Sequence, residues 1–492
     1  MTDIVGEGRV WTSLVLVLYM IGTLLLGFWL TKRNKSSEDF FVAGRTLGPA
    51  TTGFSYAATQ MSAGTVIGSV GTGANLGYNY VPVSISSTAA PWATFMTVGE
   101  RIRKIAQRIN ALTYGDIFER RYSASVRLVY AILIVLFYVP LLAAQLKASA
   151  NIMQVLLGWD YMPSLVISAV VTIIYTGASG MLGDAYTDLI QGFVMIAGFL
   201  FLVPTVIGKA GGFAAMHTSL KAINPDLIKL SGLVTGTWVF GNVVSWSFLQ
   251  IGGAPHAVFR FLAAKDTKSL RKALLWAVIF QSFIFMCVGL LGPTGRVLLP
   301  DLKDRDLTTP VLAATYMHPI LTGVLLSAVI AAVMSSVDSV LLLGSSAVTR
   351  DIYQRFMNPK MTPTQEMKIA RWVTVVLGGL GFLFAVKPIA AVQWMVAFSF
   401  SVGASAFLWP IVFTCWWPRA THQGALAGMI AGAASCLIWY GMSWAQFKSF
   451  STFPYGIWPS IIGVTVCLVV TVVVSLATKP HSEEALDVFY RA

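Results

Sequence analysis

Four ionisable residues lie within otherwise apolar stretches of the chain: Lys147, Asp184, Asp188 and Asp338. A charged side chain at membrane depth is energetically costly, and it is retained where it pairs with another charge, lines a cavity or marks an ion pathway. Because such residues are few in this sequence, each of them is a candidate for function.

Ser335, Ser336 and Asp338 form the first candidate site. On a helix the two serines point about 100° apart, and Asp338 shares a face with Ser335. Hydroxyl and carboxylate oxygens suit a small alkali cation, and the sequence offers no cluster of histidines and cysteines for a transition metal. The stretch is therefore a candidate cation site.

The stretch Gly53–Gly64 is small and polar at the start of an apolar run, and it contains Thr59, Gln60 and Ser62. One interpretation is a helix that packs closely against its neighbours. The other is a helix broken at membrane depth, which is tolerated only where protein or water satisfies the freed backbone groups. Secondary transporters bind ions and substrates at such breaks.

Two carboxylates and one amine are the other charged candidates. We expect Asp184 to be solvated at the cytoplasmic edge, and Asp188, one turn deeper, to be buried. A buried carboxylate must be paired, protonated or bound to an ion, so Asp188 could balance a cation held by the two serines. Two roles stay open for Lys147: binding an anionic group of a substrate, or neutralising a buried acid.

The segment from Trp246 to His256 contains a Gly-Gly pair and a proline, which weaken a helix. We predict that Trp246 and Gln250 line a pocket there. His256 is expected at the cytoplasmic end of the segment, near Arg260.

A membrane scaffold must position these residues. Of the 492 residues, 56% are hydrophobic and 11% are charged, and the mean hydropathy is +0.72; a soluble domain carries about 25% charged residues. We therefore expect an all-α polytopic membrane protein, with a single transmembrane domain over residues 1–492 made of spans of about 20 residues. The thirteen predicted spans are 10–31, 51–76, 80–99, 128–157, 162–180, 185–208, 234–259, 273–295, 318–348, 370–386, 388–416, 422–444 and 456–477.

Membrane topology explains the net charge of +13 better than nucleic-acid binding does. Lys and Arg collect in cytoplasmic loops, and most of them fall on one side when the N-terminus is outside and the C-terminus is cytoplasmic. We expect the basic segment 101–127 to meet lipid headgroups at the cytoplasmic surface. The four cysteines have no paired spacing and are predicted to be buried. The sequence has no nucleophile–base pair or phosphate loop, so we do not expect an enzyme.

Several stretches, taken in order, resemble the sodium/solute symporter family. They are Ser37–Gly48, Tyr186–Gln191, Gly253–His256, Ala331–Ser336, Thr349–Tyr353 and Gly424–Ile430. Each motif is weak alone, but their order is specific and the resemblance covers nearly the whole chain. It implies a LeuT-type core of two inverted five-helix repeats in a bacterial inner membrane. We place the repeats at about residues 51–208 and 234–416, with the first span and the last two outside the core.

The resemblance also implies sodium coupling. The family's sodium ligands map onto the backbone carbonyls of Ala58, Met61 and Ala332 and the hydroxyls of Ser335 and Ser336, with Asp188 as the nearby acid. Some members hold a further sodium ion around the same acid and serines, and Asp338 could contribute to such a site.

The solute is also suggested by the resemblance. Gly295–Leu302, with Asp306 after it, resembles the pantothenate branch, so pantothenate is favoured and a sodium/proline symporter is the alternative. The proline branch typically has Asp where this chain has Gln60, and Lys147 is unusual in both branches and favours a carboxylate solute. The predicted solute-binding residues are Gln60, Ser62, Lys147, Trp246 and Gln250.

Two further hypotheses compete with the symporter. A transporter-like membrane sensor without transport is one, and the short tail after Thr478 argues against it. Proton coupling through Asp188 is the other, and the intact pair Ser335 and Ser336 argues against that.

Overall fold

The computed structural model describes residues 9–31 and 36–490. All the elements in this part of the chain are helices, joined by turns and loops, and an isolated β-bridge pairs Leu47 with Ala264. The N-terminus, which we predict to be outside, falls among the residues that are not described. The elements up to residue 228 are α1 (Arg9–Thr31), α2 (Ser37–Val42), η2 (Ala43–Arg45), α3 (Pro49–Gln60), η3 (Gly64–Ser69), α4 (Val70–Leu76), η4 (Gly77–Tyr80), α5 (Val81–Ser86), η5 (Ser87–Ala89), α6 (Ala90–Thr94), η6 (Phe95–Gly99), α7 (Glu100–Arg108), α8 (Tyr114–Arg121), α9 (Ala124–Leu157), α10 (Tyr161–Lys209), α11 (Gly212–Ile223) and η7 (Pro225–Ile228).

The second half of the chain continues in the same way. Its elements are α12 (Gly236–Ser247), α13 (Gln250–Gly253), α14 (Pro255–Val258), α15 (Arg260–Ala263), α16 (Thr267–Leu298), η8 (Arg305–Leu307), α17 (Thr308–Tyr316), α18 (Pro319–Ser346), η9 (Ala347–Met357), α19 (Pro363–Val386), α20 (Val392–Trp416), α21 (His422–Phe447), η10 (Pro454–Gly456), α22 (Pro459–Ala477) and α23 (Glu483–Tyr490).

Eight helices among the described residues are long and apolar enough to cross a membrane, and shorter apolar helices lie at 10–23 and 161–173. The predicted spans 51–76, 80–99 and 234–259 fall on helices built from several short pieces. Each predicted span therefore falls mostly on helix, while the number of crossings stays a prediction.

The predicted spans 162–180 and 185–208 fall on one element, α10. Its 49 residues would extend about 73 Å as a straight helix, more than twice the hydrocarbon thickness of a bilayer. Gly180 interrupts it with φ 62° and ψ −176°, a backbone conformation that a residue with a Cβ rarely adopts. The chain therefore changes direction at Gly180, as two separate spans require.

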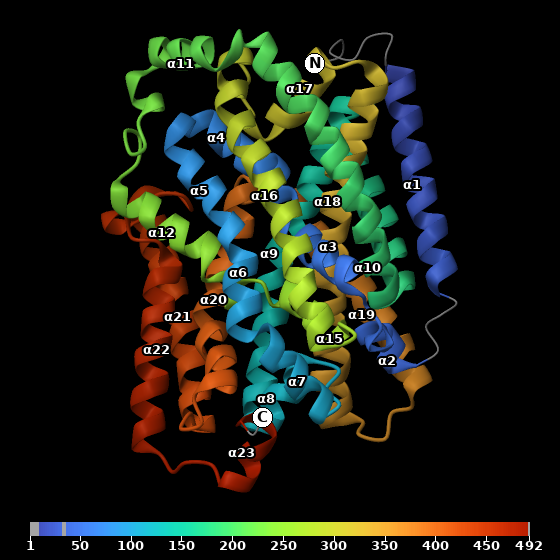
Figure 1. Cartoon of the computed structure of the whole chain (residues 1–492), viewed down its shortest axis with the longest axis vertical. Helices are drawn as coiled ribbons and strands as arrows, with labels where there is room; N and C mark the ends of the chain where they lie inside the picture. The colour runs from blue at the N-terminus through green and yellow to red at the C-terminus, as the bar shows by residue number, and fades with distance from the viewer. Residues whose placement is uncertain (1–8, 32–35, 491–492) are drawn as a thin grey trace.

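Figure 1 shows α1 along one edge of the bundle and α21 and α22 at the opposite edge, with α9 and α18 between them. We call the end that carries α7, α8 and α23 the inner end, because the basic segment 101–127 lies there, and the end that carries α11 and α17 the outer end (Figure 1). α18 runs through the core, since every residue from Leu325 to Ser346 is buried. The serine pair is therefore placed at the centre of the molecule.

The basic segment 101–127 does not present all of its charges to lipid. Arg103 and Arg121 are buried. Arg103 donates to the carbonyls of Ala264 and Lys265, at 2.5 and 2.8 Å. Arg121 donates to the carbonyl of Trp417 at 3.0 Å. The expectation that these residues meet headgroups is wrong, because their guanidinium groups hold α7 and α8 against neighbouring inner loops.

Candidate functional site

The predicted break in the first candidate helix is present between α3 and η3. Met61 takes φ −88° and ψ 70°, which ends α3, and helix resumes at Ala63. The N–H of Ala63 donates to Oε1 of Gln145 on α9 at 2.8 Å, and the N–H of Gly64 donates to the hydroxyl of Ser62 at 3.1 Å. Protein groups therefore satisfy the freed donors, as a break inside a membrane requires.

A second break lies where the Gly-Gly pair and proline predict one. α12 ends at Ser247, and Ala254 (φ −124°, ψ 56°) separates α13 from α14, which begins at Pro255. Gly252 packs on α20 so closely that a Cβ would lie 2.3 Å from the backbone nitrogen of Leu408. Only glycine fits at this contact, which fixes the broken helix against α20.

α18 packs its serines directly against the first break. The hydroxyl of Ser336 donates to the carbonyl of Thr59 at 3.2 Å, and the hydroxyls of Thr59 and Ser339 lie 3.0 Å apart. In the described part of the chain, the hydroxyl of Ser335 and Oδ1 of Asp188 are fully buried and lack a hydrogen-bond partner. Buried polar atoms without partners are rare in folded proteins. Such oxygens beside a helix break suit a dehydrated alkali cation.

The backbone carbonyls predicted as ligands lie in the same buried region. Ala58, Met61 and Ala332 are fully buried. The carbonyl of Ala58 accepts the N–H of Met61 at 3.0 Å and has a second lone pair to offer. No group of three or more His, Cys, Asp or Glu residues that could hold a metal occurs among the described residues. The predicted donors are backbone carbonyl and hydroxyl oxygens with the carboxylate of Asp188, and such oxygens suit a small monovalent ion.

Asp184 and Asp188 share one buried cation, the guanidinium group of Arg260. The guanidinium Nη2 forms an ion pair with Asp184 and lies 3.5 Å from Oδ2 of Asp188. Ser55 joins the group by donating to Oδ2 of Asp188 at 2.6 Å. Asp188 is buried as predicted, whereas the prediction of a solvated Asp184 is wrong, because Asp184 is only 1% exposed.

His256 and Arg260 are also buried and do not lie at the cytoplasmic surface. After the second break, the short helices α14 and α15 keep this segment within the core. The ring of His256 packs edge-on against that of Tyr138, and its carbonyl accepts Nη1 of Arg260 at 3.1 Å. The count of charges in the predicted loops assigned Arg260 to the cytoplasmic side. A count made on the sequence does not show which way a side chain points.

Asp338, the acid predicted to contribute to a further sodium site, is buried on α18. Its role in ion binding stays a prediction.

Two small cavities adjoin Trp246. One has a volume of about 10 Å³, and seven of its eleven lining residues carry a hydroxyl or amide group. The other, also about 10 Å³, lies on the side of Gln250 and Ser401. Each volume is close to the least that holds one water molecule. The residues lining the first cavity are Ser62, Gly64, Thr65, Ser69, Tyr80, Val83, Ser84, Ser87, Trp246, Phe285 and Gln393.

The structure brings three of the five predicted solute-binding residues to these cavities. Ser62 and Trp246 line the first cavity, and Trp246 and Gln250 line the second. Gln60 lines neither, and its amide nitrogen donates to the hydroxyl of Tyr56 at 3.4 Å.

Lys147 is held by Asp306 at the outer end. Its ammonium lies 2.8 Å from Oδ2 of Asp306, which also accepts the N–H of Val392 at 3.2 Å. Asp306 lines a cavity of about 500 Å³ together with Trp238 and Trp394. Of the two roles left open for Lys147, this geometry favours neutralising a buried acid.

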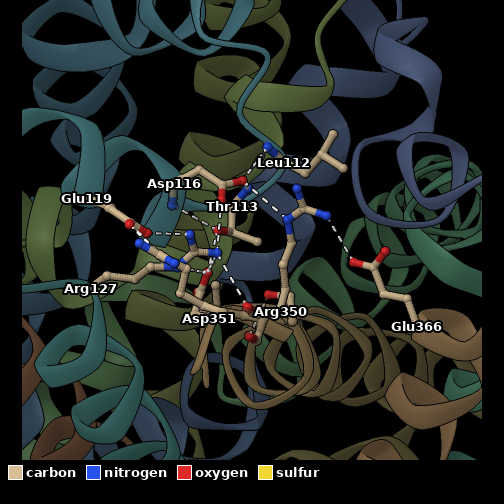
Figure 2. A network of polar contacts seen from close by, with 11 residues as sticks. Leu112, Thr113, Asp116, Glu119, Arg127, Arg350, Asp351 and Glu366 are labelled. Carbon is tan, nitrogen blue, oxygen red and sulfur yellow. Dashed lines mark hydrogen bonds and ion pairs between the residues drawn. The ribbon is translucent and has the colours of Figure 1, made fainter. Parts of the chain in front are cut away.

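An ion-pair network lies at the inner end, and Figure 2 shows it. We call it the inner network; its charged residues are Asp116, Glu119, Arg127, Arg350, Asp351 and Glu366. Arg127 on α9 contacts Asp116, Glu119 and Asp351 at 2.9, 2.8 and 2.7 Å. Arg350 then joins Asp116 to Glu366 on α19, at 3.3 and 2.9 Å. The network fastens α8 to the inner ends of α9, η9 and α19.

The electrostatics of the inner network keep Asp116 ionised. Burial by itself raises the pKa of the Asp116 carboxyl, but the guanidinium groups of Arg350 and Arg127 outweigh burial and hold the pKa below its usual range. Gly115 allows this close approach, because a Cβ there would lie 2.3 Å from the carboxyl carbon of Asp351.

Sequence reasoning missed three residues of the site: Gln145, Arg260 and Gln393. Gln145 caps the broken helix, and Gln393 donates to the hydroxyl of Tyr80 at 2.9 Å beside the first cavity. Both are uncharged polar residues inside apolar spans, which is the signal that could have identified them. Arg260 directly follows the second break, but nothing in the sequence indicates that it points inward.

Comparisons with known proteins agree on one kind of protein. Residues 40–432 match the sodium:solute symporter family. The chain is 29% identical to the osmoregulated proline transporter OpuE of Bacillus subtilis over 96% of both chains. It is 28% identical to the sodium/pantothenate symporter of Escherichia coli over 85% of this chain and 88% of that one. The solved structure of a Na+-coupled sialic acid symporter superposes with a TM-score of 0.79 at 21% identity, covering 96% of this chain and 99% of that chain, which shows a shared fold.

Proposed function

The chain belongs to the sodium:solute symporter family, and from that premise we propose that it imports a small organic acid or amino-acid-like solute by alternating access. Sodium is the coupling ion, and the fold is the LeuT type. We place the inverted repeats at about residues 51–208 and 234–416, so that each repeat begins with one of the two broken helices.

The contact between α18 and the first break carries the proposal. Sodium binds the carbonyls of Ala58, Met61 and Ala332 and the hydroxyls of Ser335 and Ser336, with Asp188 nearby as the balancing charge. Support comes from the bond between Ser336 and the carbonyl of Thr59, and from the buried oxygens of Ser335 and Asp188 that have no partner among the described residues. An ion at this place holds α18 and the broken helix together.

The solute binds in the hydroxyl-lined cavity between Ser62, Trp246 and Gln393, with Gln250 behind Trp246. Hydroxyl and amide groups can pair with the polar groups of a small solute, and the face of Trp246 can cover its apolar part. This cavity of about 10 Å³ must widen before a solute enters. Coupling is reciprocal: if sodium raises the affinity for the solute, the solute raises the affinity for sodium equally.

Pantothenate is the first solute to test and proline the second. Relatives named for transport of each match most of this chain at similar identity, so the comparisons favour neither. The hydroxyl and amide lining of the cavity supports pantothenate, which itself carries hydroxyl, amide and carboxylate groups.

Uptake into proteoliposomes tests the proposal. Radiolabelled pantothenate and proline are offered with an inward sodium gradient, then with choline in place of sodium, and then with an inward proton gradient alone. We expect uptake of one solute with sodium only. Uptake that does not depend on sodium but is driven by the proton gradient would refute the sodium site. It would favour proton coupling through Asp188.

A further inference from the structure

A cavity at the inner end lies between η6, α7, α16 and the end of α20. We call it the inner cavity; its volume is about 400 Å³, which is within the range of small-ligand sites. Its residues belong to neither the proposed sodium site nor the proposed solute site. The lining includes Phe95, Met96, Glu100, Arg101, Leu274 and Arg271.

The inner cavity is apolar on one side and charged on the other. The chain runs inward from α5 to α7 and then outward along α16 (Figure 1). Met96 therefore lies nearer the middle of the bundle than Arg101 does. Exposed apolar side chains continue outward from the cavity on both elements: Trp92 precedes Met96 by about one turn, and Leu275 and Ile279 follow on α16. These two rows can contact acyl chains where the charged side meets the membrane surface.

Arg101 is held in place on the charged side of the cavity. Its guanidinium carbon lies 3.7 Å from the ring centroid of Trp416, and Nη1 donates to the carbonyl of Cys415 at 2.5 Å. The indole Nε1 of Trp416 donates to the carbonyl of Thr97 at 2.6 Å, which fixes the ring. Within residues 9–31 and 36–490, Nε and Nη2 of Arg101 have no hydrogen-bond partner. Arg101 therefore offers oriented donors to an anion.

The charge around the inner cavity is strongly positive. Glu100 is the acid in its lining, and Arg271 pairs with both of its carboxylate oxygens. Segments 95–108 and 265–276, which frame the cavity, carry eight Lys or Arg residues and two acidic ones, Glu100 and Asp266. Asp266 accepts the N–H of Ser269 at the start of α16. The positive charge of Arg101 is therefore left for a ligand.

We propose that the inner cavity binds one anionic phospholipid of the adjacent leaflet, with its phosphate on Arg101 and its acyl chains along the rows of Trp92 and Leu275. A guanidinium group matches the geometry of a phosphate, and basic pockets between membrane helices hold anionic headgroups. A soluble anion would use the charge but not the apolar rows, so the two sides together favour a lipid. This inference goes beyond the proposed function and rests on neither sodium nor solute.

Lipid binding to the delipidated full-length protein in detergent tests the proposal. Native mass spectrometry counts bound lipids during titration with phosphatidylglycerol, and then with phosphatidylcholine that has the same acyl chains. We expect one phosphatidylglycerol bound at least roughly tenfold more tightly than phosphatidylcholine, and no displacement by millimolar inorganic phosphate. Equal affinity for the two lipids would overturn the proposal. Displacement by inorganic phosphate would also overturn it, because the cavity would then be a site for a soluble anion.

Two substitutions that remove one positive charge separate the cavity from the general surface charge. Arg101→Gln should weaken phosphatidylglycerol binding roughly tenfold, because it removes a charge-assisted contact. Arg120→Gln is the control, since Arg120 is exposed on α8 and does not line the cavity; it should bind the lipid as the wild type does. Arg101→Lys keeps the charge and should still prefer phosphatidylglycerol to phosphatidylcholine. The proposal is wrong if the two Gln variants bind the lipid equally well.

A second pair of variants decides the matter even where Arg101→Gln does not fold. Met96 is 70% exposed in the cavity wall, so its replacement should not disturb the fold. Met96→Glu places a negative charge beside the phosphate and should bind phosphatidylglycerol roughly tenfold more weakly than Met96→Gln, which has a side chain of the same size without the charge. Equal affinity in these two variants would refute the lipid site. Because the assay contains no sodium gradient and no solute, a failure of the symporter proposal would leave its result unchanged.

Discussion

At the residue scale, ion binding depends on which buried oxygens are already engaged. The hydroxyl of Ser336 donates to the carbonyl of Thr59, whereas that of Ser335 has no partner among the described residues. A hydroxyl can donate one bond and still offer its lone pairs to a cation. Ser336 can therefore hold the break in place and coordinate sodium at the same time, and Ser335 remains available to the ion.

Replacing Ser336 by Ala should weaken sodium binding without unfolding the protein. The change removes one oxygen ligand and one hydrogen bond, worth about 1 kcal/mol, so the sodium concentration for half-maximal uptake should rise roughly fivefold. Ser346→Ala is the matched control, since Ser346 is a buried serine on the same helix that donates only to the carbonyl of Leu343. An unchanged sodium dependence in Ser336→Ala would show that the assigned site is wrong.

The pair of Lys147 and Asp306 can be tested by comparing a single variant with a double variant. Because both side chains are largely buried, with 13% and 6% exposed, Lys147→Met should leave an unpaired carboxylate and destabilise the protein by about 3 kcal/mol. The double variant Lys147→Met with Asp306→Leu should recover much of this loss. Thermal unfolding of the purified protein in detergent measures both effects.

Solute affinity then distinguishes the two roles of Lys147. If Lys147 only neutralises Asp306, the double variant should transport the solute with an unchanged half-saturating concentration. A stable double variant that no longer binds a carboxylate solute would instead assign Lys147 to the solute.

At the element scale, the inner network holds α8 against α9, η9 and α19, and none of its residues belongs to the proposed sodium site. Asp351 accepts bonds from Arg127 and from the hydroxyl of Thr113, each at 2.7 Å (Figure 2). Asp351→Asn should therefore lower stability by about 3 kcal/mol while the sodium dependence of uptake stays unchanged.

The pair of Arg271 and Glu100, whose side chains are 71% and 32% exposed, is the control for the network. Solvent-exposed ion pairs contribute little to stability, so Arg271→Gln should leave the melting temperature unaltered. We assign the inner network a purely structural role. This assignment is wrong if Asp351→Asn has the melting temperature of the wild type, or if the substitution shifts the half-saturating sodium concentration.

The two helix breaks show how far the sequence predicts these elements. The polar stretch Gly53–Gly64 and the proline after the Gly-Gly pair mark both breaks, because a break requires residues that tolerate irregular backbone. The cap from Gln145 and the burial of Arg260 and Asp184 were not predicted. They depend on contacts between helices far apart in the chain, which neither hydropathy nor charge counts contain.

At the scale of the whole molecule, open space is unequally distributed. The cavity at the outer end measures about 500 Å³, and the two cavities beside Trp246 measure about 10 Å³ each. We call the cavity at the outer end the vestibule. Another cavity, of about 400 Å³, lies towards the inner end beside Glu100 and Trp416, and the centre between the two ends is closed. In the proposed alternating access, the broken helices move relative to α18 and α20, and the proposed sodium site lies across that boundary.

The direction of this pathway depends on the orientation of the bundle, which cysteine labelling can establish. Asn75 is exposed in the outer cavity, and Lys104 is exposed on α7 at the inner end (Figure 1). The four native cysteines are buried, so background labelling should be low. In intact cells a membrane-impermeant maleimide should modify Asn75→Cys and spare Lys104→Cys, which should react only after permeabilisation.

Sodium and solute together should slow the modification of Asn75→Cys, because closure of the vestibule accompanies their binding. The reverse pattern of labelling would show that the topology derived from the positive charges is inverted. The vestibule would then open to the cytoplasm.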